Sequence, residues 1–146
     1  MKPLRDLDVP RADAATGIVR TVMEDDLRDL PQREAMTVAS SDDVPGVLRR
    51  MKEAQVGCAL VLDGERFVGI FTERDAVRAL IEGDTKAVAD VMTDDVMALG
   101  ETDSVAHALS QMAIGNSRFV PVAHADGRYT VVSTADVLEY IANEDW

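Results

Sequence analysis

Two segments of the chain place a hydroxyl residue three positions before an aspartate, each time directly after a short apolar stretch. Thr72 and Asp75 form the first pair, and Ser133 and Asp136 form the second. A carboxylate beside the free amides of a helix N-terminus can accept both hydroxyls of a ribose, while the amides and a nearby arginine hold a phosphate. These residue types therefore indicate a site for a nucleotide or a related ligand.

The same spacing has a purely structural interpretation. A hydroxyl residue followed by an acid three positions later resembles a capping box, in which the two side chains only satisfy the first amides of a helix. Gly69, inside the first apolar stretch, fits a binding role better. A glycine in a strand often marks the close approach of a ligand or of another backbone. The pattern alone leaves both interpretations open.

Both pairs belong to a longer repeat with a spacing of 61 residues. Apolar positions of the first copy recur in the second without a gap: Val44, Leu48, Met51 and Val61 match Val105, Leu109, Met112 and Val122. Self-similarity at a fixed spacing marks a duplicated supersecondary unit, and two copies are too few for a solenoid. We therefore expect two pseudo-symmetric units packed on each other.

Each copy has the periodicity of a helix, two strands and a second helix. In the first copy we expect a helix that starts after Asp42, strands at 56–62 and 66–71, and a helix at 72–82. In the second copy we expect a helix from Thr102, strands at 118–123 and 128–132, and a helix at 133–142. Short segments at 36–38 and 96–99 precede these elements, and helices at 16–30 and 87–92 lead into the two copies.

This order predicts an α+β fold in three parts. We expect a flexible leader at 1–15, a first repeat with its leading helix at 16–83, and a second repeat with its leading helix at 84–146.

Composition limits the classes of partner. The chain has 146 residues and a net charge of −12, and an acidic chain repels the phosphate backbone of nucleic acids. No apolar run approaches the roughly 20 residues of a membrane-spanning helix, and the polar N-terminus lacks the apolar core of a signal peptide. The single cysteine, Cys58, cannot form an internal disulfide. We expect a cytoplasmic protein that binds neither nucleic acid nor a membrane.

A phosphate-bearing ligand would need a local basic patch in so acidic a chain. The candidate residues for such a patch are Arg66, Arg74, Arg78, Arg118 and Arg128.

At the level of whole repeats the sequence resembles cystathionine-β-synthase domains (CBS domains) arranged as a tandem pair, a Bateman module. The resemblance covers roughly residues 16–142 and is carried by residues 69–75, 91–93, 120–122 and 133–136. It implies two β-α-β-β-α repeats packed through their sheets, with ligand clefts between them. It also implies a regulatory role, such as energy sensing, with AMP, ADP, ATP or S-adenosylmethionine as the ligand and with no cofactor.

The resemblance implies that each cleft combines the hydroxyl–aspartate pair of one repeat with segments of the other. The first cleft takes Gly69, Thr72 and Asp75 from the first repeat, and Val96, Met97, Arg118, Val120 and Pro121 from the second. Every part of the family pattern is present in this cleft, including Arg118 as a basic residue for phosphate.

The second cleft departs from the family pattern. It takes Ser133 and Asp136 together with Ala35, Met36, Gly57, Cys58 and Leu60. Here Thr130 replaces the glycine, Leu60 replaces the proline and Gly57 replaces the basic residue. We therefore predict unequal clefts with one ligand per chain, the tighter site being that of Asp75.

Two hypotheses on function follow. The first is a stand-alone regulatory CBS pair that binds an adenosyl ligand and signals its occupancy to an unidentified protein target. The second is a ligand-free assembly module in which the hydroxyl–aspartate pairs are only helix caps. An enzyme is not expected, because no spacing supplies a nucleophile with its base, and His107, His124 and Cys58 make no metal set.

The resemblance further implies disc-shaped homodimers formed through the helices. Apolar residues would line that seam at Val44, Val47, Met51, Val77, Leu80 and Ile81 in the first repeat, and at Val105, Leu109, Met112, Val137, Leu138 and Ile141 in the second. Burial in the core is the competing interpretation of these stripes.

Overall fold

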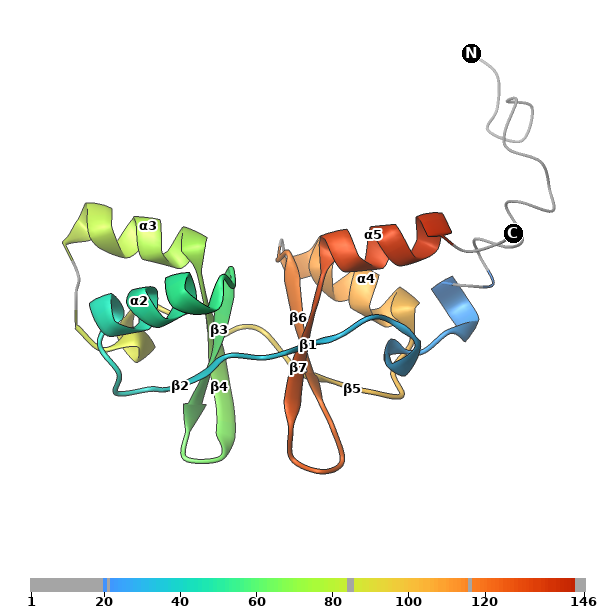
Figure 1. Ribbon diagram of the computed structural model, residues 1–146, viewed down its shortest axis with the longest axis horizontal. Helices are drawn as coiled ribbons and strands as arrows, with labels where there is room; N and C mark the ends of the chain where they lie inside the picture. Colours follow the sequence, from blue (N-terminus) through green and yellow to red (C-terminus); the bar gives the residue numbers. More distant parts are fainter. Residues whose placement is uncertain (1–19, 21, 84–85, 116, 144–146) are drawn as a thin grey trace, which may run out of the picture.

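The computed structural model describes residues 20, 22–83, 86–115 and 117–143, and it consists of two similar halves (Figure 1). The first half contains β2 (Thr37–Ala39), α2 (Val44–Ala54), β3 (Cys58–Asp63), β4 (Arg66–Thr72) and α3 (Glu73–Glu82). The second half contains β5 (Leu99–Gly100), α4 (Val105–Gly115), β6 (Phe119–Ala123), β7 (Tyr129–Ser133) and α5 (Thr134–Asn143). The predicted α+β fold of two β-α-β-β-α repeats is confirmed.

The sheets of the two halves differ in one strand. The first sheet has the order β2-β3-β4 and the second has the order β1-β7-β6-β5. Strand β1 (Arg33–Glu34) precedes the first repeat in sequence but pairs antiparallel with β7 of the second, with Arg33 opposite Val131 and Glu34 opposite Thr130. The chain therefore crosses from the second sheet to the first between β1 and β2.

Each repeat has its own apolar core between its helices and one face of its sheet. Val47, Val61 and Phe71 are fully buried in the first core, and Val105 and Val122 are fully buried in the second. Of the apolar positions that recur with the repeat, Val44, Met51, Val61, Val105, Met112 and Val122 are buried in these cores, while Leu48 and Leu109 are partly buried against them. The helical and strand periodicities therefore indicate the inner faces.

A third apolar cluster lies between the two sheets. Leu60 and Ile70 are buried there against Phe119 and Val131 of the other repeat. This cluster joins the repeats through their sheets, as the resemblance implied.

The helices that lead into each repeat are shorter than the sequence predicted, and they pack on the other repeat. Of the expected helix at 16–30, residues 16–19 and 21 lie outside the described residues. Residues 22–24 are helical, the helix breaks at Asp25, and η2 (Leu27–Asp29) is a separate 3-10 turn. The expected helix at 87–92 is likewise only the 3-10 turn η3 (Val88–Asp90).

Backbone hydrogen bonds to the rest of the fold explain these short turns. The amide of Leu27 donates to the carbonyl of Asp103 at 2.9 Å, so η2 docks on the second repeat. The amide of Val88 donates to the carbonyl of Asp42 at 2.7 Å, so η3 docks on the first. Each leading segment therefore packs on the repeat that it does not precede, at the start of α4 or α2. In the described part of the chain, no helix is both long and apolar enough to cross a membrane.

Gly69 lies where another backbone, rather than a ligand, comes close. The neighbouring Ile70 exchanges two backbone hydrogen bonds with Thr93, each of 2.9 Å. A Cβ atom on Gly69 would lie 2.8 Å from the carbonyl oxygen of Thr93 and 2.6 Å from the sulfur of Met92. The glycine thus admits the segment at 92–93 to the edge of β4, where Thr93 forms an isolated bridge with Ile70.

We expect Gly69→Ala to lower the free energy of unfolding by about 1–3 kcal/mol, because the Thr93 backbone must shift to admit a methyl group. Chemical denaturation checks this. Gly100→Ala is the matched control, since a Cβ atom there meets only Asp103 Oδ2 at an ordinary 3.6 Å. Equal free energies of unfolding for the two variants would contradict the proposed clash.

Candidate ligand clefts

The first hydroxyl–aspartate pair forms a complete capping box at the start of α3. The amide of Asp75 donates to the hydroxyl of Thr72 at 3.2 Å, and the amide of Thr72 donates to Asp75 Oδ2 at 3.0 Å. The hydroxyl of Thr72 also donates to Oδ2 at 3.1 Å. The capping role that the spacing indicated is therefore present at this helix.

The other carboxylate oxygen of Asp75 is also occupied. Oδ1 accepts a hydrogen bond from Arg78 Nη2 at 2.8 Å and another from the Thr93 hydroxyl at 3.0 Å. The Asp75 side chain is 2% exposed. A ribose could reach this carboxylate only by displacing Arg78 or Thr93.

The second pair has the same cap but a more accessible carboxylate. The amide of Asp136 donates to the Ser133 hydroxyl at 3.0 Å, and the amide of Ser133 donates to Asp136 Oδ2 at 3.2 Å. The nearest cation to Oδ1 is Arg33, whose Nη2 lies 3.7 Å away, beyond a direct hydrogen bond. The side chain of Asp136 is 12% exposed.

Substitutions at matched positions cause this difference. The residue three positions after the aspartate is Arg78 in the first repeat and Glu139 in the second, and a glutamate cannot neutralise the carboxylate. The neighbouring edge segment contributes Thr93 to the first carboxylate and Arg33 to the second. Both oxygens of Asp75 consequently accept hydrogen bonds within the fold. Asp136 keeps one oxygen without a direct hydrogen bond among the described residues.

A cleft of about 420 Å³ opens at Asp136, which we call the Asp136 cleft. Its wall includes the predicted residues Ala35, Met36, Gly57, Cys58, Ser133 and Asp136. Leu60, also predicted, is fully buried between the sheets and is not part of the wall. The expectation that this cleft has no basic residue is wrong, because Arg33 and Arg118 both line it.

A second cleft of about 360 Å³ opens at Asp75, which we call the Asp75 cleft. Thr72, Asp75, Val96 and Arg118 line it, as the sequence predicted. Other predicted residues lie elsewhere: Gly69 lies against the segment at 92–93, Val120 and Pro121 are buried, and Met97 is 68% exposed outside the cleft wall.

The basic residues separate into two groups. Arg74, Arg78 and Arg118 line the Asp75 cleft. Arg66 and Arg128 lie near the hairpin turns, where Arg66 is 3.9 Å from Asp63 and Arg128 is 2.8 Å from Glu34.

The two clefts share part of their walls. Gly57, Arg118 and Phe119 line both. A Cβ atom on Gly57 would lie 3.1 Å from the Phe119 ring, so the glycine lets this ring pack between the clefts. The exposed side chain of Arg118 makes no hydrogen bond or ion pair within the described residues, which leaves its guanidinium available to either cleft.

Neither cleft has the chemistry of a catalytic centre built on cysteine or a metal. Burial raises the pKa of the Cys58 thiol to about 12, so the reactive thiolate form is suppressed at neutral pH. Within the described ranges, no group of three or more His, Cys, Asp or Glu side chains could hold a metal ion. The clefts are suited to binding through hydrogen bonds, charge and apolar contact.

Sequence reasoning missed Arg33, Arg78 and Thr93 as partners of the two aspartates. The sequence does show that Arg78 of the first repeat is replaced by Glu139 in the second, because the two positions are 61 residues apart. The roles of Arg33 and Thr93 were not readable, because they depend on short segments that pair with the edges of β7 and β4.

Comparison with known proteins agrees with the repeated fold. A family model described as CBS domain matches residues 27–82 and 88–143. The Bacillus subtilis protein YlbB is 30% identical over 116 residues, which are 76% of this chain and 78% of YlbB. Two longer relatives come from Thermofilum pendens and Acidianus ambivalens, and the chain spans 37% and 56% of their lengths.

Solved structures share the arrangement of the two repeats. The CBS domain pair of protein MJ0100, in complex with 5′-methylthioadenosine and S-adenosyl-L-methionine, has a TM-score of 0.74 at 21% identity, over 83% of this chain and 98% of that one. The CBS domain protein PAE2072 from Pyrobaculum aerophilum, complexed with AMP, has a TM-score of 0.70 at 21% identity, over 82% and 100%. At such identities the likeness is one of fold.

The hydrogen bonds of the two aspartates predict different costs for the same substitution. We expect Asp75→Asn to lower the free energy of unfolding by about 2 kcal/mol. Both oxygens of Asp75 accept hydrogen bonds, so the amide NH₂ of an asparagine would point at donors on one side or the other and lose those bonds. Asp136→Asn should lower it by less than about 1 kcal/mol, since an asparagine oxygen can still cap α5. Chemical denaturation of both variants checks this, and a larger loss for Asp136→Asn would contradict it.

Proposed function

The chain belongs to the CBS domain family, and from that premise we propose that it is a regulatory protein that binds an adenosyl ligand between its repeats. The protein then signals occupancy of the cleft to a protein partner. The role is one of sensing rather than catalysis. The unpaired Cys58 suits a reducing compartment such as the cytoplasm.

The observation that carries the proposal is that Asp136 Oδ1 makes no direct hydrogen bond within the described residues, in a side chain that lines a cleft. A cleft-lining carboxylate that caps a helix through one oxygen and has no direct hydrogen bond on the other can accept the two hydroxyls of a ribose. The cleft volume of about 420 Å³ falls within the usual range for small-molecule sites. We therefore assign the ribose of the ligand to Asp136.

The remaining wall of the Asp136 cleft suits the other parts of such a ligand. Met36, Cys58 and Phe119 supply an apolar surface for the adenine ring. Arg33 and Arg118 supply positive charge for a phosphate or another anionic group, in a chain whose net charge is −12. AMP and S-adenosylmethionine, which occur in the similar CBS structures, belong to the ligand class that we propose.

This assignment reverses the ranking of the two clefts that the sequence predicted. The family pattern is more complete around Asp75, but four hydrogen bonds already satisfy that carboxylate. We propose that the Asp136 cleft binds first, and that the Asp75 cleft binds more weakly because Arg78 and Thr93 must move.

A ligand-free assembly module is the second candidate function. The complete capping box of Thr72 and Asp75 favours it, since that motif needs no ligand to explain it. The two candidates differ in whether any adenosyl compound stabilises the folded chain.

We also propose a homodimer. Of the residues predicted to line the seam, Val44, Val47, Met51, Val105, Met112 and Val137 are buried in the cores, and Leu109 and Ile141 are partly buried against them. Val77, Leu80 and Ile81 on α3 and Leu138 on α5 are instead exposed, which supports a narrower seam along these two helices.

Isothermal titration calorimetry with AMP tests the ligand proposal. We expect one tight site per chain, and Asp136→Asn should weaken it tenfold or more, about 1.4 kcal/mol. Asp75→Asn, in protein shown to be folded, should leave the affinity within about twofold, because Asp75 does not take part in the tight site. The opposite pattern would move the tight site to the Asp75 cleft. Absence of binding by AMP, ATP and S-adenosylmethionine would favour the assembly module.

Light scattering tests the homodimer. At micromolar concentration the mass should be about twice 15.8 kDa. Ile81→Glu should shift the mass to that of the monomer, because Ile81 is 81% exposed on α3 and a charge there would be buried in the seam. Met97→Glu, at an exposed apolar position away from both helices, is the control and should remain dimeric. A monomer in the unmodified protein would exclude the seam.

A further inference from the structure

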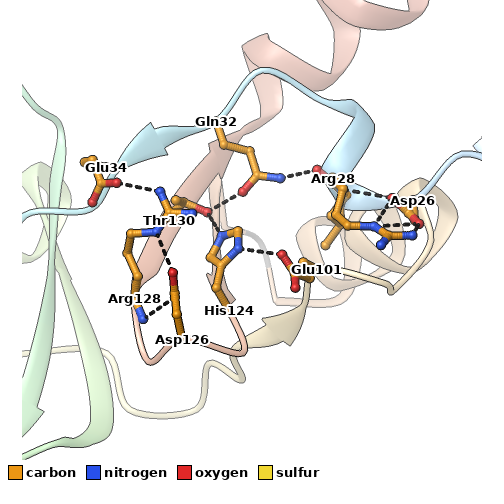
Figure 2. Close-up of polar contacts among 10 residues, drawn as sticks. Asp26, Arg28, Gln32, Glu34, Glu101, His124, Asp126, Arg128 and Thr130 are labelled. Carbon is orange, nitrogen blue, oxygen red and sulfur yellow. Dashed lines mark hydrogen bonds and ion pairs between the residues drawn. The ribbon is translucent and has the colours of Figure 1, made fainter.

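His124 joins three segments of the second repeat through its two ring nitrogens. Nδ1 lies 2.7 Å from Glu101 Oε2, and Nε2 lies 2.8 Å from the Thr130 hydroxyl (Figure 2). The Thr130 hydroxyl in turn contacts the side-chain oxygen of Gln32, and the Gln32 amide nitrogen contacts the carbonyl of Leu27. The side chain of His124 is only 9% exposed. The result is one hydrogen-bonded chain from Glu101 to η2.

The direction of each hydrogen bond in this chain is fixed from the Leu27 end. A backbone carbonyl only accepts, so Gln32 must donate its NH₂ group to Leu27. The side-chain oxygen of Gln32 then faces Thr130, and an amide oxygen also only accepts. The Thr130 hydroxyl must therefore donate its single hydrogen to Gln32.

The same reasoning fixes both protons of His124. Because the Thr130 hydroxyl gives its hydrogen to Gln32, its oxygen can only accept from His124, so Nε2 carries a hydrogen. The carboxylate of Glu101 accepts only, so Nδ1 carries a hydrogen as well. The chain is satisfied in full only by the doubly protonated, cationic ring.

Other charged groups around the ring are engaged with partners of their own. Arg128, at the start of β7, lies 2.8 Å from Glu34 and 3.7 Å from Asp126. On η2, Arg28 lies 2.8 Å from Asp26, and this contact lowers the pKa of the Asp26 carboxyl. Of the described charged side chains, Glu101 is the one that contacts the His124 ring.

This chain of hydrogen bonds holds β1 against β7. Gln32 directly precedes β1, whose Glu34 lies opposite Thr130. Arg33 of β1 lies 3.7 Å from Asp136, and the following Ala35 and Met36 form part of the Asp136 cleft. The protonation of His124 is thereby connected to the position of the cleft wall.

We propose that His124 is a positioning residue for the Asp136 cleft, acting in its cationic form through Thr130 and Gln32 to hold β1 in place. Loss of the Nδ1 proton leaves the Glu101 carboxylate facing a bare ring nitrogen, and loss of the Nε2 proton removes the donor to Thr130. In either case the ring loses one of the two contacts that fix it, and the hold on β1 through Thr130 weakens. Ligand affinity at Asp136 therefore falls as the pH rises. This inference rests on the proposed ligand function of that cleft, while the protonation of His124 can be tested without a ligand.

The described residues of the first repeat contain no equivalent of the His124 chain. The position that matches Thr130 is Gly69, and the position that matches His124 is Asp63, which lies in an exposed ion pair with Arg66. The segment at 92–93 is held by backbone hydrogen bonds between Ile70 and Thr93 and by the Thr93 hydroxyl on Asp75, and no histidine takes part in these contacts. The pH dependence therefore belongs to one cleft only.

Glu101→Gln is the variant that separates charge from geometry. A glutamine can donate its amide hydrogen to an unprotonated Nδ1, and the neutral ring can still donate from Nε2 to Thr130. The whole chain is then satisfied without a cationic ring. His107→Gln is the matched control, because His107 is the only other histidine of the chain and lies on α4.

The binding experiment is calorimetry with adenosine between about pH 5.5 and pH 8.5, which spans the range where histidines change charge. Adenosine itself keeps its charge over this range. We expect the affinity of the unmodified protein to fall about tenfold, since a lost buried hydrogen bond has an effect of that order. The affinity of Glu101→Gln should change less than about twofold, and His107→Gln should behave as the unmodified protein.

Nuclear magnetic resonance supplies the readout without a ligand. At the low end of the pH range both ring nitrogens of His124 should carry hydrogen. The amide of Ala35 donates to the carbonyl of Tyr129, and its hydrogen-exchange protection factor should fall as the pH rises. In Glu101→Gln this protection factor should not depend on pH. A singly protonated His124 at low pH, or the same pH dependence in Glu101→Gln, would overturn the inference. If adenosine fails to bind while the protection factors behave as expected, the ligand function fails and the positioning of β1 stands.

Discussion

Neither sheet of this protein can be covered by its own repeat, because the two helices of a repeat pack on one face only. The other face carries residues such as Leu60 and Ile70, which are buried only because the second repeat lies against them. Apolar burial of this kind is the dominant favourable term in folding, so the two repeats are expected to fold as one unit. Their pairing brings the N-terminal end of α3 close to Arg118 and that of α5 close to Gly57, and the two clefts open at these places.

The segment that precedes each repeat lies on the sheet of the other repeat, and its side chains determine how many hydrogen bonds the nearby aspartate accepts. The segment before the second repeat lies on β4 of the first, where the hydroxyl of Thr93 closes the Asp75 carboxylate. The segment before the first repeat lies on β7 of the second, where Arg33 Nη2 is 3.7 Å from Asp136 Oδ1 and makes no direct hydrogen bond with it. Two copies of one motif thus differ in the hydrogen bonds of their second carboxylate oxygen, although both cap a helix.

Much of the fold could be predicted from the sequence because the repeat constrains it. The match of Val61 with Val122 and of Met51 with Met112 placed the strands and helices of both copies within a few residues. The pairing of the aspartates with opposite repeats came from the family resemblance, and the walls of both clefts agree with it in part. Strand β1 escaped prediction because two residues carry no periodicity. The 3-10 turns escaped it because backbone groups of the other repeat, and not local propensity, determine them.

The contrast between Asp75 and Asp136 shows why a capping motif and a ligand site need not exclude each other. A helix cap uses one carboxylate oxygen, and the use of the second oxygen depends on side chains outside the motif. In the first repeat those side chains are Arg78 and Thr93, which give the aspartate a structural role. In the second repeat they are Glu139 and Arg33, and Arg33 is held in place by a strand that depends on Thr130 and His124. The replacement of the motif glycine by Thr130, which marks a departure from the family pattern, is therefore also the change that gives this cleft a polar anchor.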